Sequence, residues 1–339
     1  MRYFVLSKQL RELVKAAKEG IISLGEKKSG LKEKRPVKLG NHSTLFLDPH
    51  FHFMLPQFYR GGIDGIIEQA GSRVNGVCIT NRGNDAGSGI CSNKELSYDI
   101  FSKTLERTKG LSRYYADVKH IGRFFTYINY KENPQKSANN EGRPLIFVKA
   151  QEIWVDEQKV DLMALCTDYD YSSESNNCSL RPGFRTKRDI LKSIVDQGGI
   201  LYYPHPFAIR TGMAARIATS AEICELENIM CGFDFDAIEV FNSYLTLIFQ
   251  ANALAKEFIR QNNDAQRGVA SSDGHYDLSL IGKSGIHVDA ALLNFDNDYA
   301  FRDSLKNAFR NAEKQLVQQY SSFGAIANSL LVLEKKFVQ

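Results

Sequence analysis

The feature that most constrains this chain is a regular alternation of short apolar segments with amphipathic ones. The apolar segments predict strands, and they are Thr44–Leu47, Gly76–Thr80, Leu145–Val148, Val160–Cys166, Gly199–Tyr203, Ala237–Phe241 and Gly268–Ser271. The amphipathic segments have helical spacing, and they are 63–70, 94–109, 187–197, 245–261 and 299–319. Strand–helix alternation of this kind predicts an α/β fold with mainly parallel strands.

The bulk composition describes an ordinary globular protein. A chain of 339 residues with 43% hydrophobic and 24% charged residues can bury a large core without cross-links. The formal net charge is only +4, and much of it lies in residues 26–38, where six Lys/Arg face two Glu. We interpret this run as a solvated basic linker. The remainder is nearly neutral, which argues against binding of long nucleic acid and leaves it a less favoured partner.

The ends of the chain carry weaker signals. Residues 4–24 have helical spacing, so residues 1–43 are predicted to be an N-terminal helix and the basic linker. Six scattered cysteines without regular spacing indicate reduced thiols and a cytoplasmic setting. No segment approaches the roughly 20 apolar residues of a membrane span, and the first residues lack the pattern of a signal peptide. The sequence does not indicate an oligomeric state.

Two histidines one residue apart, His50 and His52, follow the first predicted strand. In a strand, residues i and i+2 point to the same side, and imidazole nitrogens bind zinc-like ions at about 2.0–2.1 Å. Taken alone, such a pair is more often two surface histidines near a loop than a metal site.

Metal-binding residue types also accompany four of the other predicted strands. Besides the two histidines they are Glu152 after the third strand, Asp161 within the fourth, His205 after the fifth, and Asp273 and His275 after the seventh. Each alone has a structural explanation, such as a helix cap, a surface ion pair or a rigid loop between prolines. Because the carboxyl ends of parallel strands meet at one mouth in an α/β barrel, the joint pattern predicts one shared site.

Seven motifs in order resemble the PHP (polymerase and histidinol phosphatase) family of metal-dependent phosphoesterases. The motifs lie between residues 44 and 290, and they are DPHFH, GVCITNR, VKAQEIWV, KVDLMAL, ILYYPHPF, AIEVFNS and SSDGHYDLSLIG. The resemblance implies a distorted, TIM-like (β/α)7 barrel over residues 44–295, with an insertion at about 86–143. A C-terminal helical segment, residues 296–339, would pack on the barrel. The resemblance also implies hydrolysis of phosphate esters by a metal-bridging hydroxide.

The resemblance implies two groups of metal ligands. His50, His52, Glu152 and Asp273 match the family's first site, and Glu152 would bridge to a second ion. That ion would also take His205 and, in place of a histidine, Asp161, with Asp156 as the alternative. The family's third site loses two of its ligands here, because FMLPQFYRG follows the histidine pair without an acid and Asn81-Arg82 replaces a histidine. We therefore expect two divalent ions, Zn, Mn or Fe.

The remaining polar residues of the expected site are Arg82 and His275. Arg82 is predicted either to bind a phosphate oxygen or to form a surface ion pair with Asp85. His275, the remnant of the third site, is predicted to act as a general acid or base. The expected substrate is a small phosphorylated molecule or a nucleotide. The alternatives are a catalytically silent PHP-like binding or scaffold domain and, third, an amidohydrolase-like C–N hydrolase.

The polar segment 167–185 interrupts the alternation of strands and helices. Long loops within compact domains are usually either functional lids or disordered. We therefore predict that this segment forms a lid over the expected site.

Overall fold

The computed structural model describes most of the chain between residues 44 and 321. The described ranges are 44–82, 95–108, 115–130, 145–155, 160–168, 187–211, 214–244, 249–311 and 314–321. The predicted N-terminal helix, the basic linker, Asp85, Asp156 and nearly all of the predicted lid lie outside these ranges. Among the described residues, no helix is long and apolar enough to cross a membrane.

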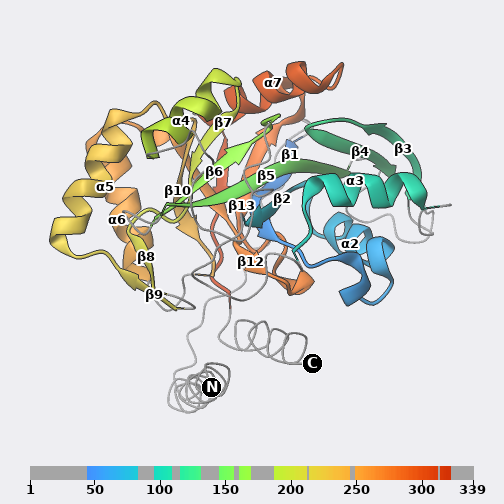
Figure 1. Cartoon of the computed structure of the whole chain (residues 1–339), viewed down its shortest axis with the longest axis horizontal. Coiled ribbons are helices and arrows are strands. Elements are labelled where there is room, and N and C mark those ends of the chain that lie inside the picture. The colour runs from blue at the N-terminus through green and yellow to red at the C-terminus, as the bar shows by residue number, and fades with distance from the viewer. Residues whose placement is uncertain are drawn as a thin grey trace, which may run out of the picture.

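The centre of the molecule is a curved sheet that forms a distorted barrel (Figure 1). Its strands, in the order in which they pair, are β11 (Gly268–Ser271), β10 (Ala237–Asn242), β7 (Ile200–Tyr203), β6 (Val160–Leu165), β5 (Leu145–Val155), β2 (Gly76–Arg82) and β1 (Thr44–His52). All seven correspond to the predicted strands. The fold is therefore α/β and TIM-like, as the sequence predicts.

The barrel closes between its last strand and its first. The chain after β11 continues into β12 (Gly274–His275), which pairs in parallel with the end of β1. The backbone N–H of Asp273 donates to the carbonyl of His50 at 2.9 Å, and that of Tyr276 donates to the carbonyl of His52 at 3.0 Å. Closure therefore occurs at the histidine pair, and it ties the seventh strand to the first.

Strand β6 differs from the prediction of parallel strands. It runs antiparallel to both neighbours, β5 and β7, whereas the other neighbouring strands of the barrel are parallel. The pairing of Val155 with Val160 makes β5 and β6 the arms of a hairpin, and a hairpin needs no crossover helix. One of the expected βα units thus lacks its helix, and the first residues of β6 lie at the barrel end where the parallel strands finish.

The two strands β1 and β5 each change partner along their length, which distorts the barrel. The first half of β1 pairs with β13 (Gly285–Asp289) and its end pairs with β12. The first half of β5 pairs with β4 (Phe125–Tyr130), and its second half pairs with β6. Both strands are longer than predicted, since each continues past the apolar segment into the polar residues.

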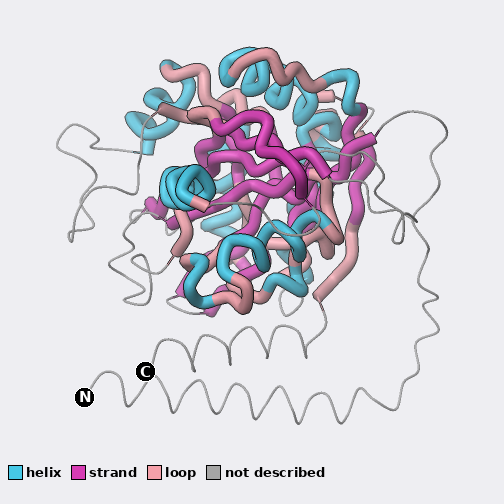
Figure 2. Tube along the Cα trace, turned by 90° about the vertical axis from the view of Figure 1, so that its right-hand side faces the viewer, coloured by secondary structure: helices cyan, strands magenta, loops and turns pink. Residues whose placement is uncertain are grey.

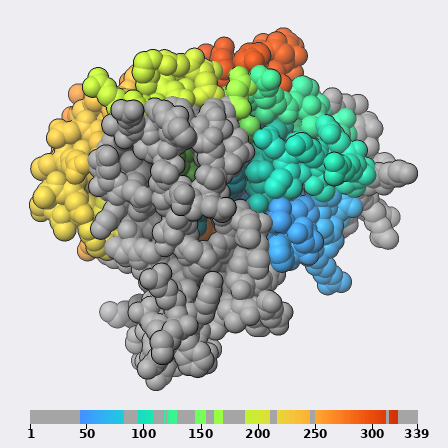
Figure 3. All heavy atoms as spheres, viewed as in Figure 1, coloured from blue at the N-terminus to red at the C-terminus, as the bar shows by residue number. Residues whose placement is uncertain are grey.

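Helices surround the barrel (Figures 1 and 2). They are α2 (Gly62–Gly71), α3 (Tyr98–Arg107), α4 (Lys187–Asp196), α5 (Ser220–Gly232), α6 (Phe249–Gln261) and α7 (Asp298–Arg310). Helix α2 shows why they form: Ile63, Ile66, Ile67 and Ala70 recur at helical spacing and are all buried. In the space-filling view, α3 (teal), α4 (yellow-green) and α5 (yellow) form much of the visible outer surface (Figure 3).

The described secondary structure also contains short elements outside the barrel strands. They are β3 (Tyr115–Ile121), β8 (Ala208–Thr211), β9 (Ala214–Ile217), β14 (Gln315–Val317) and the 3-10 helices η1 (Pro56–Phe58), η3 (Ala265–Arg267), η4 (Leu278–Leu280) and η5 (Ala290–Leu292). The insertion at 86–143 contributes α3 and the antiparallel pair of β3 with β4 to the described part of the chain.

The predicted helix at 299–319 is wrong in its second half. Helix α7 ends at Arg310, and residues 315–317 form strand β14 instead. This strand pairs antiparallel with β13, so its backbone groups complete the hydrogen bonding of a sheet edge. Pairing with an available edge outweighed the weak helical spacing.

Candidate metal centre

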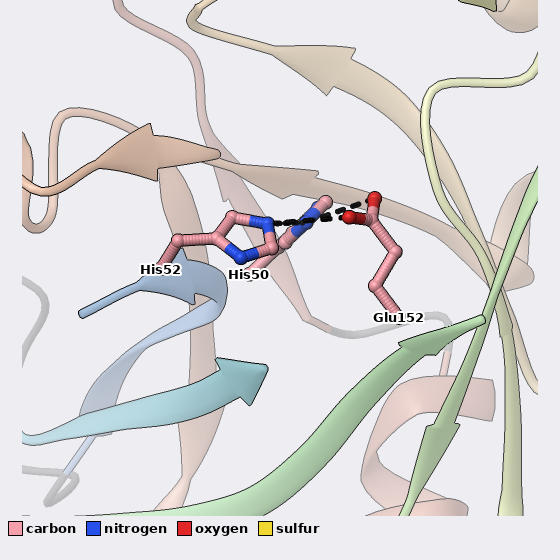
Figure 4. A group of neighbouring side chains, drawn as sticks. All are labelled: His50, His52 and Glu152. Carbon is pink, nitrogen blue, oxygen red and sulfur yellow. Dashed lines mark hydrogen bonds and ion pairs between the residues drawn. The ribbon is translucent and has the colours of Figure 1, made fainter. Parts of the chain in front are cut away.

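Strand β1 places two imidazole rings side by side inside the barrel. His50 and His52 are both fully buried and point to the same side of the strand. Their Nε2 atoms lie 3.1 Å apart, and both face the carboxylate of Glu152, which comes from β5 (Figure 4). Both histidines and the glutamate lie within their strands, not after them as predicted, because the strands continue into the polar residues.

The carboxylates of Glu152 and Asp273 both approach the Nε2 atoms of the two histidines. His50 Nε2 lies 3.7 Å from Glu152 Oε1 and 3.4 Å from Asp273 Oδ1, and His52 Nε2 lies 3.5 Å from Glu152 Oε2 and 3.7 Å from Asp273 Oδ1. For ligands at 2.0–2.1 Å from a tetrahedral ion, neighbouring ligand atoms are about 3.3–3.4 Å apart. Asp273 Oδ1 is buried and accepts no hydrogen bond from the described residues. This donor set fits a divalent metal ion.

A second group of ligand atoms shares Glu152. His205 Nε2 lies 3.2 Å from Glu152 Oε1 and 3.9 Å from Asp161 Oδ2, and Glu152 and Asp161 are buried. Asp161 reaches this position because the β5–β6 hairpin folds it back: its partner in the ladder is Trp154, two residues beyond Glu152. Two carboxylates and one imidazole form a donor set with a larger proportion of oxygen than the first group, which has two of each, and this suits a harder divalent ion.

Arg82 turns into the barrel on the other side of Glu152. In the parallel ladder of β2 and β5, Arg82 is paired with Glu152, and its Nε donates to Glu152 Oε2 at 2.9 Å. The guanidinium also forms a short hydrogen bond to Nε2 of His275. The predicted alternative partner, Asp85, lies outside the described residues.

A buried carboxylate that the sequence analysis missed, Glu239 on β10, orients the first histidine. Glu239 Oε1 lies 3.3 Å from Nδ1 of His50 and also accepts a 2.8 Å hydrogen bond from the Tyr202 hydroxyl. Its Oε2 accepts from the backbone N–H of His205 at 2.7 Å. A carboxylate behind a metal-binding imidazole fixes the ring and its tautomer. Its signal in the sequence is a single acid inside the otherwise apolar strand AIEVF.

Two further buried residues, Asn242 and Asp48, hold the metal ligand Asp273 and the residue before it in place. The side-chain amide of Asn242 donates 2.9 Å hydrogen bonds to Asp273 Oδ2 and to Glu239 Oε2. Asp48 accepts from the backbone N–H of Ser272 at 3.0 Å and from its hydroxyl at 2.5 Å, which anchors the chain just before Asp273. Burial raises the pKa of Asp48 to about 6, although these hydrogen bonds act against the shift.

The backbone is strained at three positions of the site. His205, Asp273 and Tyr276 have φ values of 25°, 46° and 63°, in a region that non-glycine residues rarely adopt. Such strain persists only where the surroundings hold it in place, and it is typical of functional sites.

The surroundings divide the four histidines into two pairs. Burial lowers the pKa of His50, but the carboxylates of Asp273, Glu239 and Glu152 outweigh it and raise the pKa to about 10. The pKa of His205 rises to about 9 against its burial, through a hydrogen bond to Glu152 and nearby carboxylates. Burial and the positive charge of Arg82 instead lower the pKa of His52 well below its ordinary value and that of His275 to about 4.

The pKa values of the carboxylates Glu152 and Glu239 are lowered, opposite to those of His50 and His205. Burial raises the pKa of Glu152, but the hydrogen bond with His205 and the charge of Arg82 outweigh it and hold the pKa well below its usual range. Burial also raises the pKa of Glu239, but the hydrogen bond and charge of His50 outweigh it and lower the pKa to about 2. Both acids are therefore ionised at neutral pH, as metal binding or its support requires.

The structure brings all eight predicted site residues together. Among the described residues, three overlapping groups contain the six predicted metal ligands, and each group's ligand atoms lie within 4.8 Å of one another. They are His50, His52 and Glu152; His50, His205 and Asp273; and Glu152, Asp161 and His205. A fourth group, His52, Asp273 and His275, lies beside Arg82. The barrel end therefore carries a cluster that can hold divalent metal.

Comparison with known proteins adds little to this geometry. No protein-family model matches the sequence, and no curated protein is significantly similar to it. One similar solved structure is a two-domain protein from Bacteroides vulgatus ATCC 8482 that contains a predicted PHP-like metal-dependent phosphoesterase. The TM-score is 0.48 at 13% sequence identity, over 86% of this chain and 70% of that one. Likeness at this level carries no conclusion about function.

Proposed function

We propose that this chain is a metal-dependent hydrolase that cleaves phosphate esters of a small phosphorylated substrate or a nucleotide. The observation that carries the proposal is that buried ligand atoms of His50, His52 and Glu152 lie within 4.8 Å of one another, with Asp273 Oδ1 3.4 Å from His50 Nε2 and 3.7 Å from His52 Nε2. The ordered PHP-like motifs of the sequence supply the reaction class. We propose that the chain belongs with the metal-dependent phosphoesterases that bind two ions.

The residues divide into two ligand sets that share one carboxylate. His50, His52, Glu152 and Asp273 would hold the first ion, and Glu152, Asp161 and His205 the second. Bound divalent ions supply Lewis acidity for the phosphoryl oxygens and lower the pKa of water at the site. Zinc, manganese or iron suits the mixed nitrogen and oxygen donors.

Arg82 and His275 are the proposed groups for the substrate. The Arg82 side chain is one-fifth exposed, so the guanidinium can also contact a phosphate oxygen while its Nε stays on Glu152. His275 Nδ1 lies 2.8 Å from the carbonyl oxygen of Asp273, so Nδ1 carries the proton and Nε2 accepts from Arg82. Because the lone pair of Nε2 is used by Arg82 in this state, His275 would act as general base when the terminal guanidinium nitrogen turns to the substrate phosphate.

The test combines metal analysis with hydrolysis. Protein purified without chelators should contain a bound transition metal, and it should cleave an aryl phosphate monoester or diester when manganese or zinc is supplied. His50→Ala should lose both properties, whereas Arg123→Ala, which alters an exposed ion pair with Asp168, should retain them. Absence of bound metal from the unaltered protein would refute the proposal.

One observation favours a second function, a catalytically silent binding or scaffold domain. The 2.9 Å ion pair between Arg82 and Glu152 occupies an oxygen of the carboxylate that would bridge two ions. If this ion pair is sufficient to neutralise the buried carboxylate, the domain needs no metal ion to keep its fold. Metal-loaded protein that hydrolyses neither monoesters nor diesters, and whose stability does not change on metal removal, would favour this function.

A further inference from the structure

The fourth group of ligand atoms, those of His52, Asp273 and His275, differs from the other three. Its donor atoms also lie within 4.8 Å of one another, and it includes none of Glu152, Asp161 and His205. Asp273 Oδ1 is buried without a hydrogen bond from the described residues, and it lies 3.5 Å from Nδ1 of His275. By composition, this group too is suited to a divalent cation.

The guanidinium of Arg82 already binds the atoms that such a cation would need. Nδ1 of His275 donates to a carbonyl, so the lone pair that remains for a metal is on Nε2, and Arg82 donates to that atom. On its other side Arg82 donates to Glu152 Oε2 at 2.9 Å. One fixed positive charge therefore bridges an imidazole nitrogen and a carboxylate oxygen, as a metal ion would.

A hydrogen bond from the backbone of Arg82 to Glu95 helps to hold Arg82 in this position. The Arg82 N–H donates to Oε2 of Glu95 at 2.7 Å, and the Tyr276 hydroxyl donates to Oε1 of the same carboxylate at 2.5 Å. Glu95 also lies 3.8 Å from Nδ1 of His52, on the side away from the first ligand group. Glu95 and Tyr276 are buried. Arg82 is thus surrounded by groups of negative or acceptor character, which explains why a partly buried cation is stable there.

We propose that Arg82 is a built-in cation that takes the place of a third metal ion and so sets how many ions the centre holds. This inference rests on the proposed metal centre, and it concerns the number of ions and not the reaction. Removing the guanidinium would leave His275 Nε2, Glu152 Oε2 and Asp273 around a space that formerly held positive charge. A divalent ion would then occupy that space.

The test is metal stoichiometry in the full chain. The unaltered protein, Arg82→Ala and Arg82→Met are each loaded with zinc or cobalt, desalted, and measured by elemental analysis. We expect one more ion per chain in both Arg82 variants than in the unaltered protein. The double variant Arg82→Ala/His275→Ala should return to the original number. Arg123→Ala removes an arginine from an exposed ion pair and should leave the number unchanged.

Two measurements keep the inference separate from the proposed function. Anomalous diffraction from the loaded Arg82→Ala protein should show an ion bound to Nε2 of His275. Ions in the unaltered protein, with the same number in both folded Arg82 variants, would overturn this inference and leave the two-metal centre standing. Absence of ions from all variants would overturn both. Arg82→Met keeps the apolar stem of the side chain and removes the guanidinium, so it preserves the test if Arg82→Ala does not fold.

Discussion

The two sides of Glu152 differ in the charge that surrounds their histidines. On the side of Asp161, carboxylates raise the pKa of His50 to about 10 and that of His205 to about 9. On the side of Arg82, burial and the guanidinium lower the pKa of His52, and they lower that of His275 to about 4. Four imidazoles within one barrel end thus belong to two electrostatic environments.

The difference shows which side requires a cation from outside. A buried carboxylate needs a compensating positive charge. Around His50 and His205 that charge has to come from bound protons or from metal ions, since the described ligands there are acids and imidazoles. Around His275 the chain supplies it through Arg82. The asymmetry supports two external ions and one internal cation.

The largest effect is expected from Glu152→Gln, which removes the group common to both sides. Glutamine keeps the shape but not the charge, so both ligand sets lose their shared oxygen donor. Metal affinity should fall by more than the roughly 10–100-fold typical of a lost outer partner. Calorimetric titration with zinc measures the change, with the exposed Glu257→Gln as the control. Affinity within a few-fold of the unaltered protein would contradict the central role of Glu152.

Asp161→Asn should affect one side only. Asp161 belongs to the group with Glu152 and His205, and it has no part in the group of His50, His52 and Glu152. The variant should keep one tightly bound ion and lose the other, as measured by elemental analysis after dialysis. Loss of both ions, or of neither, would show that the two sides do not bind metal independently.

Much of this site could be predicted from the sequence, because its ligands are few in type and follow recognisable apolar strands. His50, His52, His205 and Asp273 each come soon after such a segment, and the barrel geometry then brings them together. Asp161 is also predicted as a ligand, but the prediction does not include the antiparallel direction of its strand. It reaches Glu152 through an antiparallel hairpin, and strand direction is not encoded in the apolar pattern of a short segment.

The supporting residues could not be predicted in the same way. Glu95 is predicted to lie in the helical segment 94–109, but helix α3 begins only at Tyr98, and the contacts of Glu95 with Arg82 and Tyr276 depend on how this residue packs before the helix. Glu239 is a lone acid in a buried strand, and only the structure shows that it faces His50. The sequence also left open whether Arg82 points inward. The ladder of β2 with β5 decides this, because it sets Arg82 opposite Glu152.

Glu239→Gln should weaken metal binding on the carboxylate side by about 10–100-fold, the usual effect of losing an outer carboxylate partner. The amide carries no charge and supports the His50 imidazole less well than the carboxylate does. Titration with zinc measures the affinity, and Glu225→Gln on the exposed face of α5 is the matched control. An affinity equal to that of the unaltered protein would show that His50 needs no such partner.

The two environments also predict that metal binding releases protons. In the metal-free protein His50 and His205 keep their protons at pH 7, since their pKa values are raised to about 10 and about 9. Metal ligation requires neutral imidazoles, so full loading at pH 7 should release about two protons per chain. Calorimetry in buffers of different ionisation enthalpy measures the number. The release should fade as the pH rises through 9 and 10, and a binding enthalpy independent of buffer would contradict it.

The smallest effect is expected from Thr219→Ala, which tests whether the loss of ions from the site variants is separate from a loss of general stability. Thr219 caps helix α5 in a capping box with Glu222, whose N–H lies 3.4 Å from the threonine hydroxyl. Loss of such a cap costs about 1 kcal/mol of the free energy of unfolding. Thr219→Ala should lower stability to denaturant by this amount and leave the number of bound ions unchanged. If this variant also loses an ion, then losses in the site variants reflect weakened folding, and the comparison between the two sides of Glu152 does not hold.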